Sequence, residues 1–202
     1  MRQVPEIIKT LWRTPVWRIN TAEKVIYLTF DDGPNPVVTT RVLDILDEYG
    51  AKATFFCVGE NVLRFPEVFA EVKRRGHAVG NHTYNHIKGV EKTLQEYEEN
   101  VNKADELIHS KLFRPPHGRI TFRQINALKK KFKIIMWDFI TYDFDKHVNP
   151  AEIMQEVRRR SRKGSIVIFH DSLKARDTML EVLPQALKFW KDNGYEIASL
   201  TL

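Results

Sequence analysis

The sequence contains little that could hold the chain together other than a protein core. Its one cysteine, Cys57, has no partner in 202 residues, so no intramolecular disulfide can form. Cys57 lies in an apolar run, where we expect a buried, unreactive thiol rather than a nucleophile. No segment approaches the roughly 18 apolar residues that a membrane-spanning helix needs. The fold must therefore depend on burial of apolar side chains, which make up 43% of the chain.

The first 20 residues lack the features of a secretory signal peptide. Such a peptide has an uninterrupted apolar core of about 7–15 residues. Here charged residues interrupt the segment at Arg2, Glu6, Lys9, Arg13 and Arg18. We therefore expect a cytoplasmic protein, or one whose export signal is missing from this sequence or is of an unrecognised kind.

A moderate excess of positive charge excludes little. The chain has 32 basic and 26 acidic residues, a net charge of +6. The excess lies mostly in residues 129–133 and 158–163, and such runs are usually solvated helix faces. No nucleic-acid recognition motif accompanies them, so we expect no nucleic-acid partner. Nothing in the sequence specifies an oligomeric state.

Apolar strands alternate with amphipathic helices along the whole chain. The predicted strands are 25–30, 53–58, 77–81, 112–114, 133–137, 165–169 and 195–200, and the predicted helices are 37–49, 66–75, 93–109, 122–131, 150–162 and 178–193. A Thr93-x-x-Glu96 capping box opens the third helix, and Asn149-Pro150 opens the fifth. Pro184 weakens the prediction of the last helix. Seven strands alternating with six helices indicate an α/β fold with a parallel sheet, either a barrel or an open doubly wound sheet.

The positions of the polar side chains favour the barrel. Five of them, each from a different predicted strand, follow a C-terminal end: Asp31, His82, Arg114, Asp138 and His170. In a barrel these ends converge on one face and build the active site, whereas in an open sheet they spread along a line.

Two short segments carry the residue types of a metal site. Asp31 and Asp32 end the first strand, and adjacent residues leaving a strand point in different directions. One carboxylate can then bind a metal while the other accepts a proton; alternatively, the Asp-Asp-Gly turn only caps the next helix. His82 and His86 are four residues apart, so a helical turn or a compact loop places both imidazoles on one side. Two histidines and an aspartate form a common metal-binding set with open coordination positions.

An arginine and a late histidine complete the candidate machinery. Arg114 precedes two prolines, and a guanidinium beside a catalytic carboxylate keeps that acid ionised; the alternative is a surface arginine. His170 ends an apolar strand and could act as a general acid toward a departing amine. Asp143 and Asp171 are both candidates for the carboxylate that raises its pKa. His77, His109 and His147 lack such neighbours and are interpreted as structural.

Taken in order, these motifs resemble a known family. Thr29-Phe-Asp-Asp-Gly33, His82-Thr-x-x-His86, Arg114-Pro-Pro-x-Gly118 and the apolar strand ending at His170 are similar to the motifs of the polysaccharide deacetylases of carbohydrate esterase family 4, the NodB-homology domain. The resemblance covers residues 24–202 and leaves residues 1–23 as an N-terminal extension. It implies a single catalytic domain folded as a distorted seven-stranded (β/α) barrel. The implied reaction is hydrolytic removal of acetyl from an N-acetylated amino sugar.

The resemblance also implies a role for each matched residue. Asp31 matches the general base, and Asp32, His82 and His86 match the ligands of one divalent metal ion, zinc by default with cobalt as the other choice. Arg114 matches the residue that positions the base, His170 the general acid and Asp143 the acid that tunes it. For the substrate, the backbone N–H of His117 matches the oxyanion donor, and Trp137 and Ile168 match the lining of the acetyl pocket.

Three residues depart from the family pattern and bear on the substrate. Ile140 stands where an aspartate is usual, Phe144 where a tryptophan is usual, and His117 where a tyrosine is usual. We expect a carbohydrate substrate such as peptidoglycan or a chitooligosaccharide. The alternatives are the same machinery acting on a small amide or nucleotide sugar, and an inactive carbohydrate-binding protein. Retention of acid, base and metal ligands argues against the latter, because binding alone requires none of them.

Overall fold

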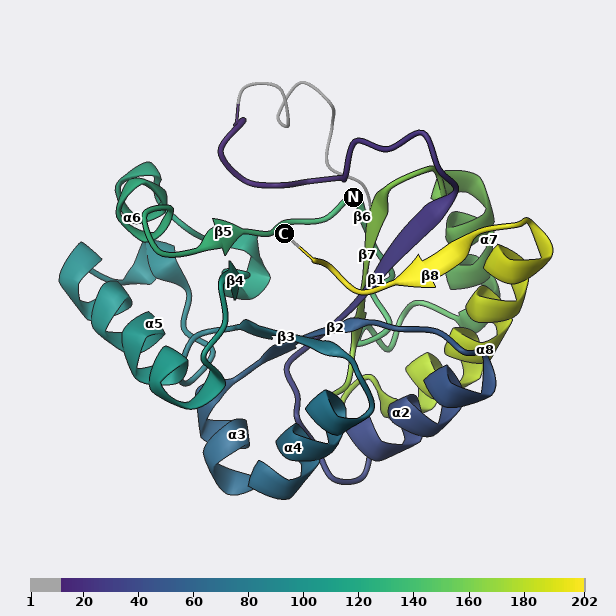
Figure 1. The fold of residues 1–202 in the computed structure, drawn as a ribbon, viewed down its shortest axis with the longest axis horizontal. Coiled ribbons are helices and arrows are strands. Elements are labelled where there is room, and N and C mark those ends of the chain that lie inside the picture. The colour runs from purple at the N-terminus through teal and green to yellow at the C-terminus, as the bar shows by residue number, and fades with distance from the viewer. Residues whose placement is uncertain (1–11, 202) are drawn as a thin grey trace.

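The structure, a computed structural model, describes residues 12–201, so the first part of the predicted N-terminal extension lies outside the described residues. Seven strands lie side by side in the order β5-β4-β3-β2-β1-β7-β6, and every pairing is parallel. Their bounds are β1 Val25–Asp31, β2 Thr54–Cys57, β3 Ala78–Asn81, β4 Leu112–Phe113, β5 Lys133–Ile134, β6 Phe139–Ile140 and β7 Ser165–His170. An eighth strand, β8 (Glu196–Ala198), pairs with the beginning of β1 (Figure 1).

The two edges of this sheet are joined by one short run of chain. β5 and β6 stand at opposite ends of the strand order, yet only residues 135–138 separate them in sequence. Val16 pairs with the same run: its N–H donates to Ile134 O, and its carbonyl accepts from the Met136 N–H, both at 2.8 Å. Arg18 makes an isolated bridge to Ser165 on the other side. These contacts curl the sheet into the distorted barrel that the sequence predicted.

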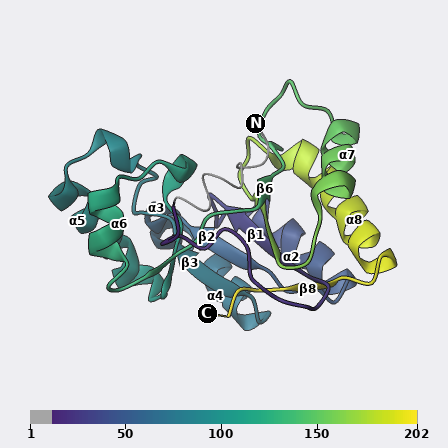
Figure 2. The same cartoon turned by 90° about the horizontal axis from the view of Figure 1, so that it is seen from above.

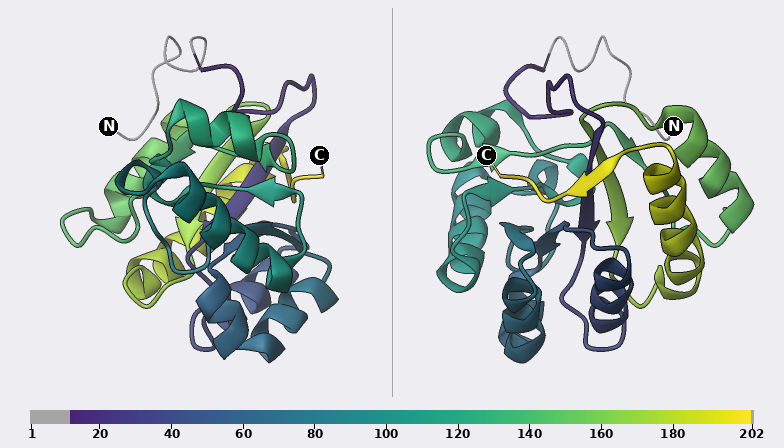
Figure 3. Two further views of the ribbon diagram at one scale, coloured as in Figure 1. Left: turned by 90° about the vertical axis from the view of Figure 1, so that its left-hand side faces the viewer. Right: turned by 45° about the vertical axis from the view of Figure 1, so that its right-hand side comes forward.

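Seven helices in the described part of the chain cover the outside of the sheet. They are α2 Thr39–Glu48, α3 Gly59–Arg64, α4 Pro66–Arg74, α5 Leu94–Ile108, α6 Phe122–Leu128, α7 Pro150–Arg160 and α8 Arg176–Asp192. Seen from above, α5 and α6 lie at one end of the molecule and α7 and α8 at the other (Figure 2). α7 packs against α8 (Figure 3). The Trp190 indole donates to the Ser161 hydroxyl at the end of α7. No helix among residues 12–201 is long and apolar enough to cross a bilayer.

Local sequence signals set the ends of several helices. The capping box predicted at Thr93 is present: its side chain accepts from the Glu96 N–H, and the Glu96 carboxylate accepts from the Thr93 N–H. Asn149 caps α7 by accepting from the Glu152 N–H, with Pro150 in the first turn. α8 runs without interruption through Pro184 and begins at Arg176, two residues earlier than predicted.

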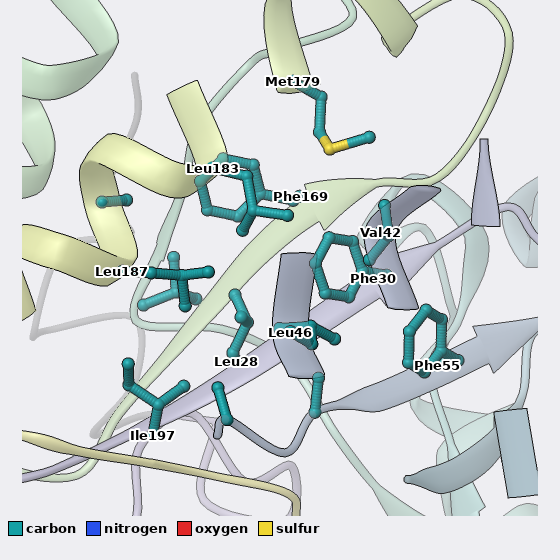
Figure 4. Packing of buried hydrophobic residues seen from close by; sticks show 14 of the residues in the cluster. Leu28, Phe30, Val42, Leu46, Phe55, Phe169, Met179, Leu183, Leu187 and Ile197 are labelled. Atoms are coloured by element: carbon teal, nitrogen blue, oxygen red, sulfur yellow. The ribbon is translucent and has the colours of Figure 1, made fainter. Parts of the chain in front are cut away.

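Alternation along the strands separates the core from the interior of the barrel. Leu28 and Phe30 of β1 face outward into the main core under α2 and α8, where Phe30 stacks on Phe55 at 5.0 Å between ring centroids (Figure 4). Tyr27 faces the other way and packs with the apolar cluster that contains Phe56. The same alternation turns Thr29 and Asp31 inward, as their contacts show below.

The structure corrects the sequence prediction at three places. β6 and α3 were not predicted; β6 has only two residues and α3 only six, too short for a periodic pattern. Asp138 was expected among the side chains of the site, but it is buried and paired with Arg162 at 2.6 Å, and Ser165 donates to it. Its partners belong to the beginning of β7, away from the C-terminal strand ends.

Candidate active site

A cavity of about 630 Å³ opens where the C-terminal ends of the strands converge. A volume of this size is typical of small-molecule binding sites. Eight of the ten residues proposed from the sequence line it: Asp31, Asp32, His82, His86, His117, Trp137, Ile168 and His170. The other two, Arg114 and Asp143, are buried directly behind lining residues. Residues far apart in the chain are thus brought to one face of the barrel.

Asp31 is held by an arginine that is itself fully buried. Strand alternation turns Thr29 and Asp31 inward together, and Arg114 Nη1 donates to both, at 2.8 Å and 2.6 Å. Arg114 Nη2 donates to the Met136 carbonyl, and the guanidinium lies 4.0 Å from the Phe56 ring centroid. The alternative of a surface arginine is therefore wrong. A charge-assisted bond of this kind fixes the orientation of the carboxylate.

Asp32 and the two histidines form a three-donor cluster. His86 Nε2 lies 3.1 Å and His82 Nε2 3.8 Å from Asp32 Oδ1, and one donor atom from each residue lies within 4.8 Å of the others. Donors bound to one tetrahedral ion at about 2.0–2.2 Å lie about 3.4 Å apart, so the spacing fits a divalent ion. His82 and His86 lie in a loop after β3, which resolves the choice between a helical turn and a compact loop.

The surroundings of the cluster favour metal-binding protonation states. His82 Nδ1 lies 2.7 Å from the Arg114 carbonyl, which orients Nε2 toward the cluster. Burial lowers the pKa of His82 to about 4, so this imidazole is neutral at pH 7. Burial of Asp32 opposes ionisation, but the hydrogen bond to His86 and the nearby histidines hold its pKa well below the ordinary value. A neutral imidazole and an ionised carboxylate are the forms that bind metal.

The backbone around these ligands is held in uncommon conformations. Asp32, Thr83 and His86 have positive φ values of 84°, 65° and 58°. Such residues persist only where surrounding contacts enforce them. Asn61 Nδ2 donates to the Asp32 carbonyl at 2.7 Å, and Asn81 Oδ1 accepts from the Thr83 N–H at 2.9 Å. Amide side chains thus preorganise the ligand loops. The Asp31 and Asp32 carboxylates do not cap the beginning of α2, so the alternative in which the Asp-Asp-Gly turn only caps the next helix is wrong.

The structure identifies the acid that faces His170. His170 Nδ1 lies 2.7 Å from Asp143 Oδ1, while Asp143 Oδ2 accepts from the His170 backbone N–H at 2.8 Å. Burial alone would lower the pKa of His170, but the Asp143 charge and hydrogen bond raise it to about 9. The other candidate, Asp171, turns away and accepts from the Gly33 N–H and the Thr39 hydroxyl. In the sheet His170 is registered opposite Asp31.

The residues that differ from the family pattern all lie at the cavity. Ile140, Phe144 and His117 line it, with the Phe144 ring edge-on to His170 at 4.7 Å and the His117 ring 4.7 Å from His86. His117 has a φ of 57° in a short 3-10 turn, Pro116–Gly118. A Cβ on Gly118 would come within 2.5 Å of Trp137, so only glycine lets this indole lie against the turn.

Several charged lining residues were not found by sequence reasoning. Lys88, Glu91, Arg119 and Lys174 all line the cavity. Arg119 directly follows the motif at Arg114–Gly118, and Lys174 lies four residues after His170, so proximity to the motifs was an available signal. Exposed charges are too common in loops for that signal to decide anything without the tertiary structure.

Comparisons with known proteins agree with this geometry. The family model for polysaccharide deacetylases matches residues 18–132. A peptidoglycan-N-acetylglucosamine deacetylase of Bacillus cereus is 32% identical over 193 residues, covering 92% of this chain and 90% of the relative. A chitooligosaccharide deacetylase of Azorhizobium caulinodans is 31% identical over 162 residues, covering 76% and 77%.

Solved structures show the same fold. The Bc1960 peptidoglycan N-acetylglucosamine deacetylase, solved with a naphthalenyl N-hydroxybenzamide, has a TM-score of 0.90 at 28% identity, covering 96% of this chain and 94% of that chain. BA3943 of Bacillus anthracis, described as a pseudoenzyme of carbohydrate esterase family 4, has a TM-score of 0.83 at 25% identity, covering 92% and 67%.

Proposed function

The chain belongs to the polysaccharide deacetylase family, whose members similar to it include deacetylases of peptidoglycan N-acetylglucosamine and of chitooligosaccharides, and we propose that its substrate is the N-acetylated glycan of peptidoglycan. The observation that carries the proposal is the convergence, on one cavity, of a three-donor metal cluster with two different proton-transfer groups. The Asp31–Arg114 pair joins the end of β1 to the residue after β4, and the His170–Asp143 pair joins the end of β7 to the loop after β6. A protein that only binds sugar requires neither pair.

The two pairs serve opposite proton transfers, as a hydrolysis of this kind requires. Asp31, held by Arg114, accepts the proton of the attacking water. His170, protonated near neutral pH because Asp143 raises its pKa to about 9, donates to the sugar nitrogen as the carbon–nitrogen bond breaks. The products are acetate and a free amine. The His117 backbone N–H donates to the developing oxyanion.

We propose that Asp32, His82 and His86 hold one divalent ion, and that the ion is zinc. Two imidazoles and one carboxylate form a donor set that zinc accepts readily, although the same donors also bind cobalt. When bound, such an ion polarises the acetyl carbonyl and lowers the pKa of water. Ile168 and Trp137 line the space beside the cluster, and we assign them to the acetyl group.

Acetate release from defined glycans tests this function. Protein loaded with zinc should release acetate from peptidoglycan glycan strands and more slowly from oligomers of N-acetylglucosamine. Chelation should abolish the release, and added zinc should restore it. If acetate is released only from a nucleotide sugar, the substrate is a small soluble sugar and not a polymer. Binding of glycan without acetate release would show an inactive carbohydrate-binding protein.

A further inference from the structure

The mouth of the cavity carries two cations that have no carboxylate partner in the part of the chain that the structure describes. Four charged side chains line its outer part, namely Lys88, Glu91, Arg119 and Lys174. Lys88 Nζ lies 3.0 Å from Glu91 Oε1, so these two charges offset each other. Within residues 12–201 no carboxylate lies in ion-pair distance of Arg119 or Lys174. The outer part of the cavity therefore has a positive excess.

The two cations stand on opposite sides of the barrel mouth. Arg119 follows the turn after β4, whereas Lys174 follows β7, and three strands lie between β4 and β7 in the sheet order. The metal cluster and Asp31 come from β1 and the loop after β3, between them. A glycan whose acetamido group reaches the cluster would thus extend past a cation in each direction.

Both residues are anchored at the cavity. Arg119 is anchored through its backbone, whose carbonyl accepts from the Gly89 N–H at 2.8 Å. Lys174 Nζ lies 5.1 Å from the Phe144 ring centroid, and Phe144 packs edge-on to His170. Cation and aromatic ring attract each other at this distance, which keeps the ammonium group beside the reaction centre.

From this arrangement we infer that Arg119 and Lys174 form an anion-binding rim that selects glycans carrying carboxylates on the sugars flanking the target sugar. The inference rests on the proposed deacetylation and names its substrate class more narrowly. In a peptidoglycan strand N-acetylglucosamine alternates with a sugar that bears a lactyl group. Where the stem peptide has been removed, that group is a free carboxylate, so each target sugar of a peptide-free strand has an acidic neighbour on both sides. An oligomer of N-acetylglucosamine has no such charge and gains nothing from the rim.

One glycan in two charge states tests the rim. The substrate is a peptide-free peptidoglycan glycan strand, used with free carboxylates and with the same carboxylates converted to methyl amides. At low salt the wild-type protein should show a higher kcat/KM for the free acid. Lys174→Gln and Arg119→Gln should each reduce the ratio of the two kcat/KM values about two- to fivefold, the range expected of exposed ion pairs. Added salt should reduce the ratio as well.

Matched substitutions elsewhere separate a local effect from a loss of net charge. Lys130→Gln and Arg123→Gln remove the same residue types from exposed positions outside the cavity and should leave the ratio unchanged. A wild-type ratio of one at low salt, or a double variant that keeps the wild-type ratio, would overturn the rim while deacetylation itself stands. No acetate from either form of the glycan would overturn the proposed function and the rim with it.

Discussion

The Asp171 carboxylate accepts a hydrogen bond from the Gly33 N–H at 3.0 Å, which joins the residue after His170 to the residue after Asp32. Its second oxygen accepts from the Thr39 hydroxyl at 2.6 Å, and the Asp171 N–H donates to the Asp31 carbonyl at 3.1 Å. A Cβ at position 33 would lie 2.0 Å from this carboxylate, so only glycine allows the approach. Asp171 thereby fixes the turn that carries the base and a metal ligand.

Removing this carboxylate should loosen the turn. Asp171→Ala leaves the buried Gly33 N–H and Thr39 hydroxyl without their acceptor, and we expect a loss of about 1–3 kcal/mol in the free energy of unfolding. Zinc affinity should fall too, although Asp171 is not a ligand. Denaturant unfolding of the apo protein and a competition assay with a metal indicator measure the two effects. Unchanged zinc affinity in a folded Asp171→Ala protein would show that the turn is held by other contacts.

The same residue predicts a dependence of stability on pH. Burial and the Asp32 charge raise the pKa of Asp171 to about 7, against an ordinary value of 3.8. Between these values the folded protein holds a proton that the unfolded chain releases, so the contribution of Asp171 to stability falls as the pH rises from about 4 to 7. The free energy of unfolding of Asp171→Asn, taken relative to wild type, should therefore increase as the pH rises toward about 7 and then stay level. Unfolding of the apo proteins at several pH values between 5 and 8 measures this difference. A difference that is constant with pH would contradict this assignment.

The metal cluster predicts selective loss of zinc on removal of one imidazole. His82→Ala deletes a donor and should weaken zinc binding by a factor of 10–100 or more, since even loss of outer contacts to a metal site costs about 10–100-fold. Metal content after dialysis and competition titration measure the change. His147→Ala, which removes an exposed histidine outside the cavity, is the control. Equal zinc binding by wild type, His82→Ala and Asp32→Ala would show that the ligands were misassigned.

Asp31 and Asp32 are adjacent but should respond differently to substitution. Asp31→Asn removes the proton acceptor while keeping the shape of the side chain, so we expect zinc to stay bound and kcat to fall by about 10²–10⁴. Asp32→Asn should lose zinc together with activity. Metal content and acetate release, measured on the same preparations, distinguish the two. Loss of zinc from Asp31→Asn alone would reverse the two roles.

The His170–Asp143 pair predicts the alkaline limb of the pH–rate profile. His170 donates a proton only below its pKa, which Asp143 raises. Asp143→Asn removes the negative charge, lowers that pKa and should move the alkaline limb to lower pH, with zinc content unchanged. The limb reports the coupled groups of the site, so the direction of the shift is the observable. A limb that stays in place in an active variant would separate Asp143 from the protonation of His170.

Much of the fold could be read locally. The six predicted helices all occur, and the caps at Thr93 and Asn149 form as the sequence indicates, because helix ends depend on residues three or four positions apart. β6 escaped prediction because two residues carry no period, and it is defined by pairing with β7. The short motifs supplied the ten site residues proposed from the sequence, since each lies within a few residues of a strand end, whereas Lys88, Glu91, Arg119 and Lys174 were found only in the tertiary structure.

The sequence by itself determined the alternation of strands and helices, the placement of the motifs after strands, and the residue types available for metal binding and proton transfer. The tertiary structure decided which of these groups meet. Sequence position left both Asp143 and Asp171 as candidates beside His170, and the family resemblance favoured Asp143. The tertiary structure pairs Asp143 with His170 and Asp171 with Gly33. In the structure Asp138 forms an ion pair with Arg162, and Arg119 and Lys174 line the cavity. Contacts between residues distant in sequence depend on sheet order and loop path, which no local pattern contains.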